Sequence, residues 1–157
     1  MTISVRRLRS GDEAILELLA RDDADFDLDD RGGGRPPLSP EAARAYLADS
    51  NVLHWIAEKQ GVIVGHMHCT LVRKFAGDPA EILLYEIGVR SAHRRQRVGR
   101  SLMNAMDAYM QEHGLKESWV LADNPGAVAF YRACGFKIEK PEPVYLLRPG
   151  DGDDADA

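Results

Sequence analysis

A basic turn between an apolar strand and an amphipathic helix is the part of the sequence that most clearly predicts chemistry. The strand ends near Val89, residues 90–100 hold five arginines and no acid, and a helix is expected to begin near Gly99. The first turn of a helix has backbone N–H groups without partners and carries the positive end of the helix dipole. The turn is therefore a candidate site for an anion such as a pyrophosphate. The alternative is a solvated basic loop before an ordinary helix.

A single carboxylate interrupts the strand that leads into this turn. Glu86 lies in the apolar run 82–87, where an ionised carboxylate is costly unless it is paired or used. Because it precedes the turn by only a few residues, Glu86 is a candidate to accept a proton from a ligand held there. The alternatives are a glutamate on a solvated strand face and a glutamate in a salt bridge.

Two motifs together resemble those of the GNAT superfamily of N-acetyltransferases. Residues 96–101, Gln-Arg-Val-Gly-Arg-Ser, resemble its Q/R-x-x-G-x-G/A signature, although Ser101 replaces the usual glycine or alanine and Arg97 stands where glycine is frequent. A second signature of the family is matched at every position by Asn124, Ala127, Phe130, Tyr131, Gly135 and Phe136. The resemblance covers residues 3–147. It implies an α/β (α+β) fold with a mixed, mostly antiparallel central sheet of six to seven strands flanked by about four helices.

The resemblance also implies acetyl-coenzyme A as the cofactor. Amides of residues 96–101 would hold the pyrophosphate, the amide of Val89 would steady the thioester carbonyl, and Asn124 would contact the pantetheine arm. Glu86 would act as general base, through water, because an amine attacks a thioester only as the free base. Tyr131 would protonate the departing thiolate, unless it is only a core aromatic residue. The expected cofactor-binding residues are Ile87, Val89, Arg94, Arg95, Gln96, Arg97, Val98, Gly99, Arg100, Ser101, Asn124 and Tyr131.

Within the superfamily, the sequence is most similar to the small aminoglycoside 3-N-acetyltransferases. The similarity lies in residues 81–89, 93–96 and 125–131, although that subfamily commonly has aspartate at the position of Glu86. An aminoglycoside carries several ammonium groups, which carboxylates on exposed loops would attract, but acidic loops are also often plain solvated surface. The expected substrate-binding residues are Asp25, Asp27, Asp29, Asp30, Glu86 and Asp123.

Two other functions stay open at this point. In one, the chain is an acetyltransferase whose amine substrate is a polyamine, a small metabolite or a protein amino group. In the other, it is a non-catalytic acyl-coenzyme A-binding domain. Turnover with a panel of amines separates these functions from the preferred one.

An H-x-H pair on one predicted strand, His66 and His68, raises the question of a metal site. With residues 60–61 as a two-residue hairpin turn, His66 is expected to face Trp55, while His54 points to the other side of the sheet. No third ligand is then in register, and we expect no metal. The two histidines are expected at the surface or in the substrate pocket.

The elements that must position these residues are read from periodicity and turn signals. Helices are expected at 10–20 with Ser10 as its cap, 39–49 with Ser39 as its cap, 99–113 and 125–134. Segment 21–35, acidic and then rich in glycine and proline, is expected to be a long exposed loop. The expected strands are 3–8, 52–59, 62–74, 82–89, 118–122, 136–140 and 144–147.

Composition limits the class of protein. The 157 residues suit one domain, expected at 1–148, followed by an acidic tail at 149–157 that is expected to be disordered. A net charge of −5 argues against nucleic acid as a partner. Without a signal peptide or a long apolar run, the chain is expected in the cytoplasm and away from membranes. Cys69 and Cys134 are expected to be buried, unreactive thiols, and a homodimer would be compatible with the apolar late strands.

Overall fold

The computed structural model describes residues 2–26 and 33–150, which form two compact units. The N-terminal unit ends at Asp123 and the C-terminal unit begins at Asn124. The first unit holds the sheet and four of the helices, and the second holds the last helix. In the described ranges, no helix has the length and apolar composition that a membrane span requires.

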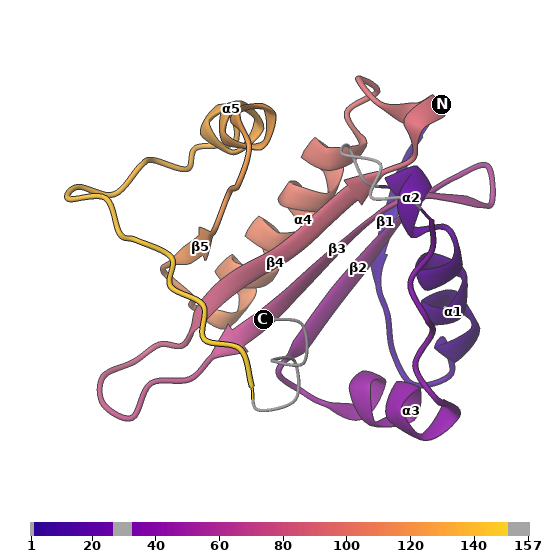
Figure 1. The fold of residues 1–157 in the computed structure, drawn as a ribbon, viewed down its shortest axis with the longest axis horizontal. Helices are drawn as coiled ribbons and strands as arrows, with labels where there is room; N and C mark the ends of the chain where they lie inside the picture. The colour runs from indigo at the N-terminus through magenta and orange to yellow at the C-terminus, as the bar shows by residue number, and fades with distance from the viewer. Residues whose placement is uncertain (1, 27–32, 151–157) are drawn as a thin grey trace. The chain divides into compact units, whose positions relative to one another are not determined.

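The N-terminal unit is built on a sheet whose strands lie in the order β1-β2-β3-β4-β5 (Figure 1). Strands β1 to β4 are antiparallel to their neighbours, and β4 and β5 are parallel, with α4 (Val98–His113) connecting them. The predicted mixed, mostly antiparallel sheet is therefore confirmed. The strands are β1 (Ser4–Arg7), β2 (Val52–Lys59), β3 (Val62–Val72), β4 (Glu81–Val89) and β5 (Ser118–Val120).

The predicted number of strands is too high. Among the described residues, 136–140 and 144–147 form no strand, and the side chains of Val144, Tyr145, Leu146 and Leu147 are exposed. Their apolar pattern suits a strand, but a strand exists only when a second strand accepts its backbone hydrogen bonds. The described part of the C-terminal unit contains no such partner.

Helix α4 packs on one face of the sheet (Figure 1). A Cβ atom added to Gly65 on β3 would lie 2.6 Å from Val98 Cγ1, so glycine allows the first turn of α4 to approach the strand closely. The fully buried side chains of this layer come from alternate strand positions and from one stripe of the helix. They include Leu53, Met67, Leu84, Leu102 and Met106.

The opposite face carries α1 (Glu13–Arg21), α2 (Asp23–Phe26) and α3 (Pro40–Ala48) (Figure 1). Phe26 is buried on β4 at Gly88, where an added Cβ would lie 2.8 Å from the Phe26 backbone oxygen. Phe26 also joins Leu8, Leu19 and Ile56 in a buried cluster. Glycine at position 88 therefore lets α2 lie directly on the strand that carries Glu86.

The helix signals were partly correct. The Oγ atom of Ser39 accepts a hydrogen bond from the Ala42 backbone N–H at 3.2 Å, as expected for its cap. Gly114 ends α4 with a left-handed φ of 66°. The predicted Ser10 cap is wrong, because α1 begins at Glu13 and Asp12 occupies the N-cap position.

The segment 21–35 is not entirely irregular, contrary to the prediction. Asp23–Phe26 form the single turn α2, which the acidic composition concealed. Tertiary contacts stabilise it, since Phe26 is buried and Arg90 pairs with the adjacent carboxylates of Asp22 and Asp25. A local pattern contains no information about an arginine 65 residues further along the chain.

The β2–β3 hairpin contains a register shift. Its two-residue turn, Gln60 and Gly61, has φ values of 53° and 78°, which agrees with the predicted hairpin. The pairing shifts between Ala57 and Glu58 on β2. Every residue beyond the shift therefore has a different partner from the one that the turn alone predicts.

The C-terminal unit contains α5 (Pro125–Ala133). Asn124 caps it, since its Oδ1 atom accepts a hydrogen bond from the Ala127 backbone N–H at 2.8 Å. Tyr131 is buried, and its ring lies 5.6 Å from that of Phe136 and 5.5 Å from that of Phe130. The predicted helix is confirmed to within one residue.

Candidate active site

The basic turn runs from the end of β4 to α4 through one short 3-10 turn, Ser91–His93. The backbone N–H of Arg90 donates to the Val64 carbonyl oxygen at 2.9 Å, which ties the turn to β3. Arg95 and Arg97 then adopt left-handed φ values of 62° and 66°. These are uncommon for residues other than glycine, and alternation of right- and left-handed residues directs successive N–H groups to one side.

Helix α4 begins without a side-chain cap on its first turn. The first hydrogen bond of the helix joins the Ser101 N–H to the Arg97 carbonyl oxygen at 3.0 Å, so the N–H groups of Val98, Gly99 and Arg100 precede it. Arg97 occupies the N-cap position without a side-chain cap, and the first turn holds no acidic residue. The arrangement is suited to an anion.

The arginines of the turn have different surroundings. Arg95 and Arg97 are exposed beside the helix start. Arg94 is half-buried, and its Nε donates to the Val89 carbonyl oxygen at 3.3 Å. Arg90 contacts acidic residues instead of serving the turn: its Nη atoms lie 3.0 Å from Asp22 Oδ2 and 3.1 Å from Asp25 Oδ2. The basic and acidic segments of the sequence therefore partly neutralise each other.

The edge of β4 leads directly into this turn. The β4–β5 pairing ends at Leu84 and Val120, whereas β4 runs on to Val89. Among the described residues, no strand covers this edge of β4 beyond Leu84. An exposed strand edge offers N–H and C=O groups to an extended ligand with amide groups. The residues present thus fit a ligand with an amide-containing arm and a phosphate end.

Glu86 is paired rather than isolated. Its Oε1 atom lies 2.8 Å from Arg35 Nη2, and the same nitrogen lies 2.8 Å from Asp23 Oδ1. The backbone N–H of Arg35 donates to the Ala20 carbonyl oxygen at 2.9 Å, which fixes the arginine beside the end of α1. The salt-bridge alternative for Glu86 is therefore present in the structure, and two carboxylates share one guanidinium nitrogen.

The predicted substrate-binding aspartates have different surroundings. Asp25 contacts Ser91 and Arg90, and these hydrogen bonds lower the pKa of its carboxyl group. Asp123 is exposed at the end of the N-terminal unit. Asp27, Asp29 and Asp30 lie outside the described residues.

Three histidines gather on the sheet face that carries Glu86. His54 lies opposite His68 in the β2–β3 pairing, and its ring stacks on that of His68 at 5.4 Å. His54 Nε2 lies 2.9 Å from His66 Nδ1, and His54 Nδ1 lies 2.8 Å from the hydroxyl oxygen of Tyr46 on α3. The prediction that His54 points away from His66 is wrong, because the register shift in the hairpin places both on one face.

His66 is not at the surface, contrary to one of the expectations, whereas His68 is half-buried. His54 and His66 are only 6% and 4% exposed. Burial lowers the pKa of His66 to about 4 and holds the pKa of His54 well below its ordinary value, so both rings are neutral at pH 7. Within residues 2–26 and 33–150, no group of three or more His, Cys, Asp or Glu residues is arranged to hold a metal ion.

The two cysteines differ. Cys69 is buried on β3, and burial raises the pKa of its thiol to about 12, which agrees with an unreactive thiol. Cys134, at the end of α5, is only half-buried. The expectation of a buried thiol is therefore correct for Cys69 alone.

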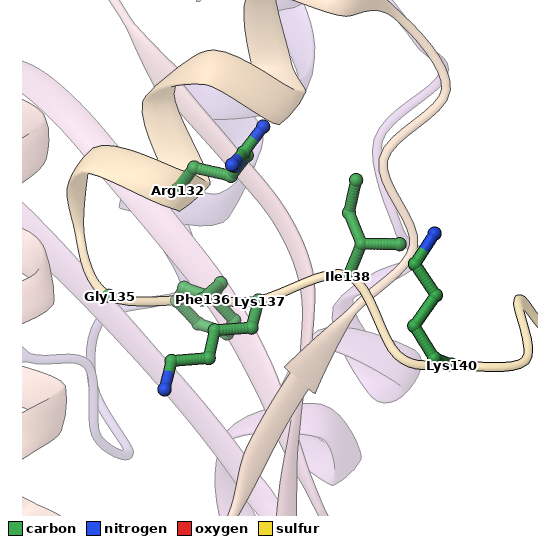
Figure 2. A pocket seen from close by; sticks show the side chains of 6 residues that line it. All are labelled: Arg132, Gly135, Phe136, Lys137, Ile138 and Lys140. Carbon is green, nitrogen blue, oxygen red and sulfur yellow. The ribbon is translucent and has the colours of Figure 1, made fainter.

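A hollow of about 530 Å³ lies in the C-terminal unit and contains no predicted site residue. Figure 2 shows Arg132 on the last turn of α5, and Phe136, Ile138 and Lys140 on the segment that follows Gly135. Its charged lining side chains are all cationic. It has no group able to remove a proton from an ammonium ion, so it does not replace the predicted site.

Sequence reasoning missed Arg35, Asp23, Tyr46 and His54 as residues of the site. Arg35 lies in a glycine- and proline-rich segment that predicts only a loop. The correct β2–β3 register would have grouped His54 with the H-x-H pair. The register shift at Ala57, however, cannot be recognised from the residue types. Tyr46 belongs to a predicted helix, and only packing decides which face of that helix meets β2.

Comparisons with known proteins agree with this geometry. The family model described as "Acetyltransferase (GNAT) family" matches residues 15–136. N-acetyltransferase 8 of Rattus norvegicus is 25% identical over 99 residues, which are 62% of this chain and 45% of that protein. The chain thus spans less than half the length of the curated relatives that it matches.

Two solved structures share the fold over nearly the whole chain. An aminoglycoside acetyltransferase from an uncultured soil metagenomic sample has a TM-score of 0.80 and 25% identity, covering 96% of this chain and 99% of that one. A second aminoglycoside acetyltransferase from such a sample, in complex with sisomicin, has a TM-score of 0.78 and 19% identity, with coverage of 94% and 97%. At the lower identity the similarity concerns the fold alone.

The left-handed backbone of Arg97 explains why glycine suits this position, and it predicts a gain in stability. For Arg97→Gly we expect the free energy of unfolding to rise by about 0.5–1 kcal/mol, because relief of a conformational cost of about 1–2 kcal/mol exceeds the entropy cost of glycine, about 0.5–1 kcal/mol. Urea unfolding measures the change. Arg97→Ala is the control, since alanine loses the same side chain but keeps the cost. Equal stability of the two variants would contradict this explanation.

The buried histidines predict that stability falls in mild acid. The unfolded chain binds protons at these positions below the ordinary value of 6.5, whereas folded His66 binds one only near pH 4. The stabilisation is complete above pH 6.5 and is lost as the pH falls towards 4. Between pH 7 and pH 5 we expect a loss of about 2 kcal/mol from His66, and His54 changes the stability in the same direction. Urea unfolding at the two pH values measures it, and His66→Gln should reduce the loss; an unchanged pH dependence in that variant would oppose the assignment.

Proposed function

Because the chain belongs to the acetyltransferase (GNAT) family, we propose that it transfers an acetyl group to a primary amine, specifically the 3-amino group of an aminoglycoside. Acetyl-coenzyme A is the cofactor of this family, and when bound it supplies an activated acetyl thioester. The observation that carries the proposal is the uncapped start of α4 beside the uncovered edge of β4. One continuous line of backbone donors there matches a ligand with phosphates at one end and amides along its arm.

The cofactor-binding residues follow this line. The amides at residues 96–100 would hold the pyrophosphate, with the side chains of Arg95 and Arg97 adding positive charge. The predicted contact from the Ser101 amide is dropped, because that N–H already donates to the Arg97 carbonyl oxygen. The main chain of Ile87 and Val89 pairs with the extended arm. The caps of the two helices differ: the Arg97 side chain does not cap α4, whereas Asn124 caps α5 with its own side chain. Asn124 would contact the pantetheine arm, as the family resemblance implies.

Three residues carry the acetyl transfer in this proposal. Glu86 removes a proton from the ammonium ion of the substrate through water, since only the free amine is a nucleophile. The amide of Val89 donates a hydrogen bond to the carbonyl oxygen on which negative charge develops. Tyr131, which is buried on α5, donates its hydroxyl proton to the departing thiolate.

The substrate class rests on charge and on similarity. Glu86 and Asp23 lie at 2.8 Å from one guanidinium nitrogen, which supports a site where cations are favoured. The solved structure at 25% identity is an aminoglycoside acetyltransferase. Asp25, Asp123 and the aspartates at 27, 29 and 30 would attract the further ammonium groups of such a substrate.

A panel of amines tests the substrate. With acetyl-coenzyme A and a thiol-release assay, we expect turnover with aminoglycosides, and NMR of the product should show the acetyl group on the 3-nitrogen. Omitting the amine controls for thioester hydrolysis. Turnover with only a polyamine or a peptide amine would replace the aminoglycoside as substrate. Binding of acetyl-coenzyme A in isothermal titration without turnover of any amine would indicate a non-catalytic domain.

A pair of charge variants tests the division of roles. Glu86→Gln should lower kcat at neutral pH by about 10²-fold or more, because general-base catalysis contributes that much, and should leave the Kd of acetyl-coenzyme A nearly unchanged. Arg95→Glu should raise the KM for acetyl-coenzyme A and preserve kcat at saturation. Tyr131→Phe should lower kcat by a smaller factor. Full activity of Glu86→Gln across the pH range would remove Glu86 as the base, and an unchanged KM would remove Arg95 from the phosphate site.

A further inference from the structure

The imidazole of His68 lies where three features of the sheet coincide. His68 on β3 is directly opposite Glu86 on β4, so the two side chains lie on the same face. The β3–β4 register shifts immediately beyond this pair, between His68 and Cys69. The β4–β5 pairing ends at Leu84, two residues before Glu86. A bulge beside a lost strand partner is an arrangement that directs side chains into a functional site.

Aromatic rings hold the His68 ring in place. It stacks on His54 at 5.4 Å with an interplanar angle of 14°, and it contacts Tyr46 at 5.5 Å and Tyr85 at 5.4 Å. His54 is itself fixed by hydrogen bonds at both ring nitrogens, to Tyr46 and to His66. In the part of the chain that the structure describes, the side-chain contacts of His68 are these ring contacts. The ring is therefore oriented without engaging its nitrogen atoms.

The charges around His68 favour a neutral ring that can take up a proton. Partial burial lowers the pKa of His68, with Glu86 opposing the shift and Arg35 adding to it. Its other titratable neighbours are Tyr46 on α3, His54 on β2, His66 on β3 and Tyr85 on β4. At pH 7 the imidazole thus keeps a free lone pair. One oxygen of Glu86, by contrast, is already occupied by Arg35.

We propose that His68 accepts the proton that Glu86 removes from the substrate amine, so that carboxylate and imidazole act as one acid–base unit. The inference rests on the proposed acetyl transfer and deepens it. An ammonium ion R–NH₃⁺ passes one proton through Glu86 to the unprotonated nitrogen of His68, and the amine keeps the lone pair that attacks the thioester carbonyl carbon. The C–N bond forms, the C–S bond breaks, and the second proton ends on the thiolate. The imidazolium then returns its proton to solvent.

The Tyr46–His54–His66 chain has a positioning role in this unit. Burial raises the pKa of Tyr46 and lowers those of His54 and His66, so all three are neutral at pH 7. They add no positive charge beside His68, which would oppose its protonation. Their hydrogen bonds keep the His54 ring in the plane on which His68 stacks.

The test compares His68→Gln with His113→Gln. His113 lies at the end of α4, where it stacks on Tyr109, and it is the matched control. His68→Gln should lower kcat at pH 7 by at least about ten-fold, as loss of an acid–base group does, while the KM for acetyl-coenzyme A stays within about two-fold. Added imidazole should restore part of the rate in His68→Gln alone. A kcat equal to that of His113→Gln would overturn the proposal.

A measurement on the unaltered chain guards against misfolding of the variant. NMR titration of His68 in the wild type should show a neutral ring at pH 7 and an apparent pKa that changes in Glu86→Gln, because coupled groups titrate as a pair. An imidazolium at pH 7, or an unchanged pKa in Glu86→Gln, would overturn the inference. If the wild type acetylates no amine, the proposed function itself fails. If it does and His68→Gln retains the wild-type kcat and pH profile, only the role of His68 is wrong.

Discussion

The structure depends on an incomplete set of backbone hydrogen bonds at the end of β4. The strand continues to Val89 after its partner β5 has separated at Val120, and α4 begins nearby without a cap. The first N–H groups of a helix and the edge of a strand lack partners within their own element, so a fold that places the two side by side in one row is suited to a ligand that pairs with both. An extended cofactor with amides and phosphates has the required chemistry.

Close packing on both faces holds this row in place. Gly65 lets the start of α4 approach β3, and Gly88, on the neighbouring strand, lets Phe26 approach from the opposite face. Arg90 joins the basic turn to the α1–α2 segment. Its guanidinium lies 4.5 Å from the Phe26 ring centre, and its nitrogen atoms pair with Asp22 and Asp25. The basic turn and the acidic helix turn therefore belong to one packed unit, although Arg90 and Asp25 are 65 residues apart in the chain.

The sheet face that carries Glu86 contains both charged and neutral titratable groups. Glu86 and Asp23 share Arg35 near the surface, whereas His54 on β2 and His66 on β3 are buried and neutral. The buried histidines lie in a less polar environment than Glu86 and Asp23, and burial disfavours the charged form of a side chain. The buried histidines therefore add no positive charge of their own that would repel a cationic substrate.

The sequence by itself determined most elements of the fold, the turn before Gly99 and the family signatures, because each depends on residues close together in the chain. It also placed Glu86 on the strand that enters the turn. Only the tertiary structure decided that Arg35 pairs with Glu86, that α2 forms, and that His54 joins His66 and His68 on one face of the sheet. Residues 136–147 form no strand, since pairing needs a partner that local pattern cannot supply. Contacts between distant residues, and one extra residue in a hairpin, determine these features, and neither leaves a periodic signal.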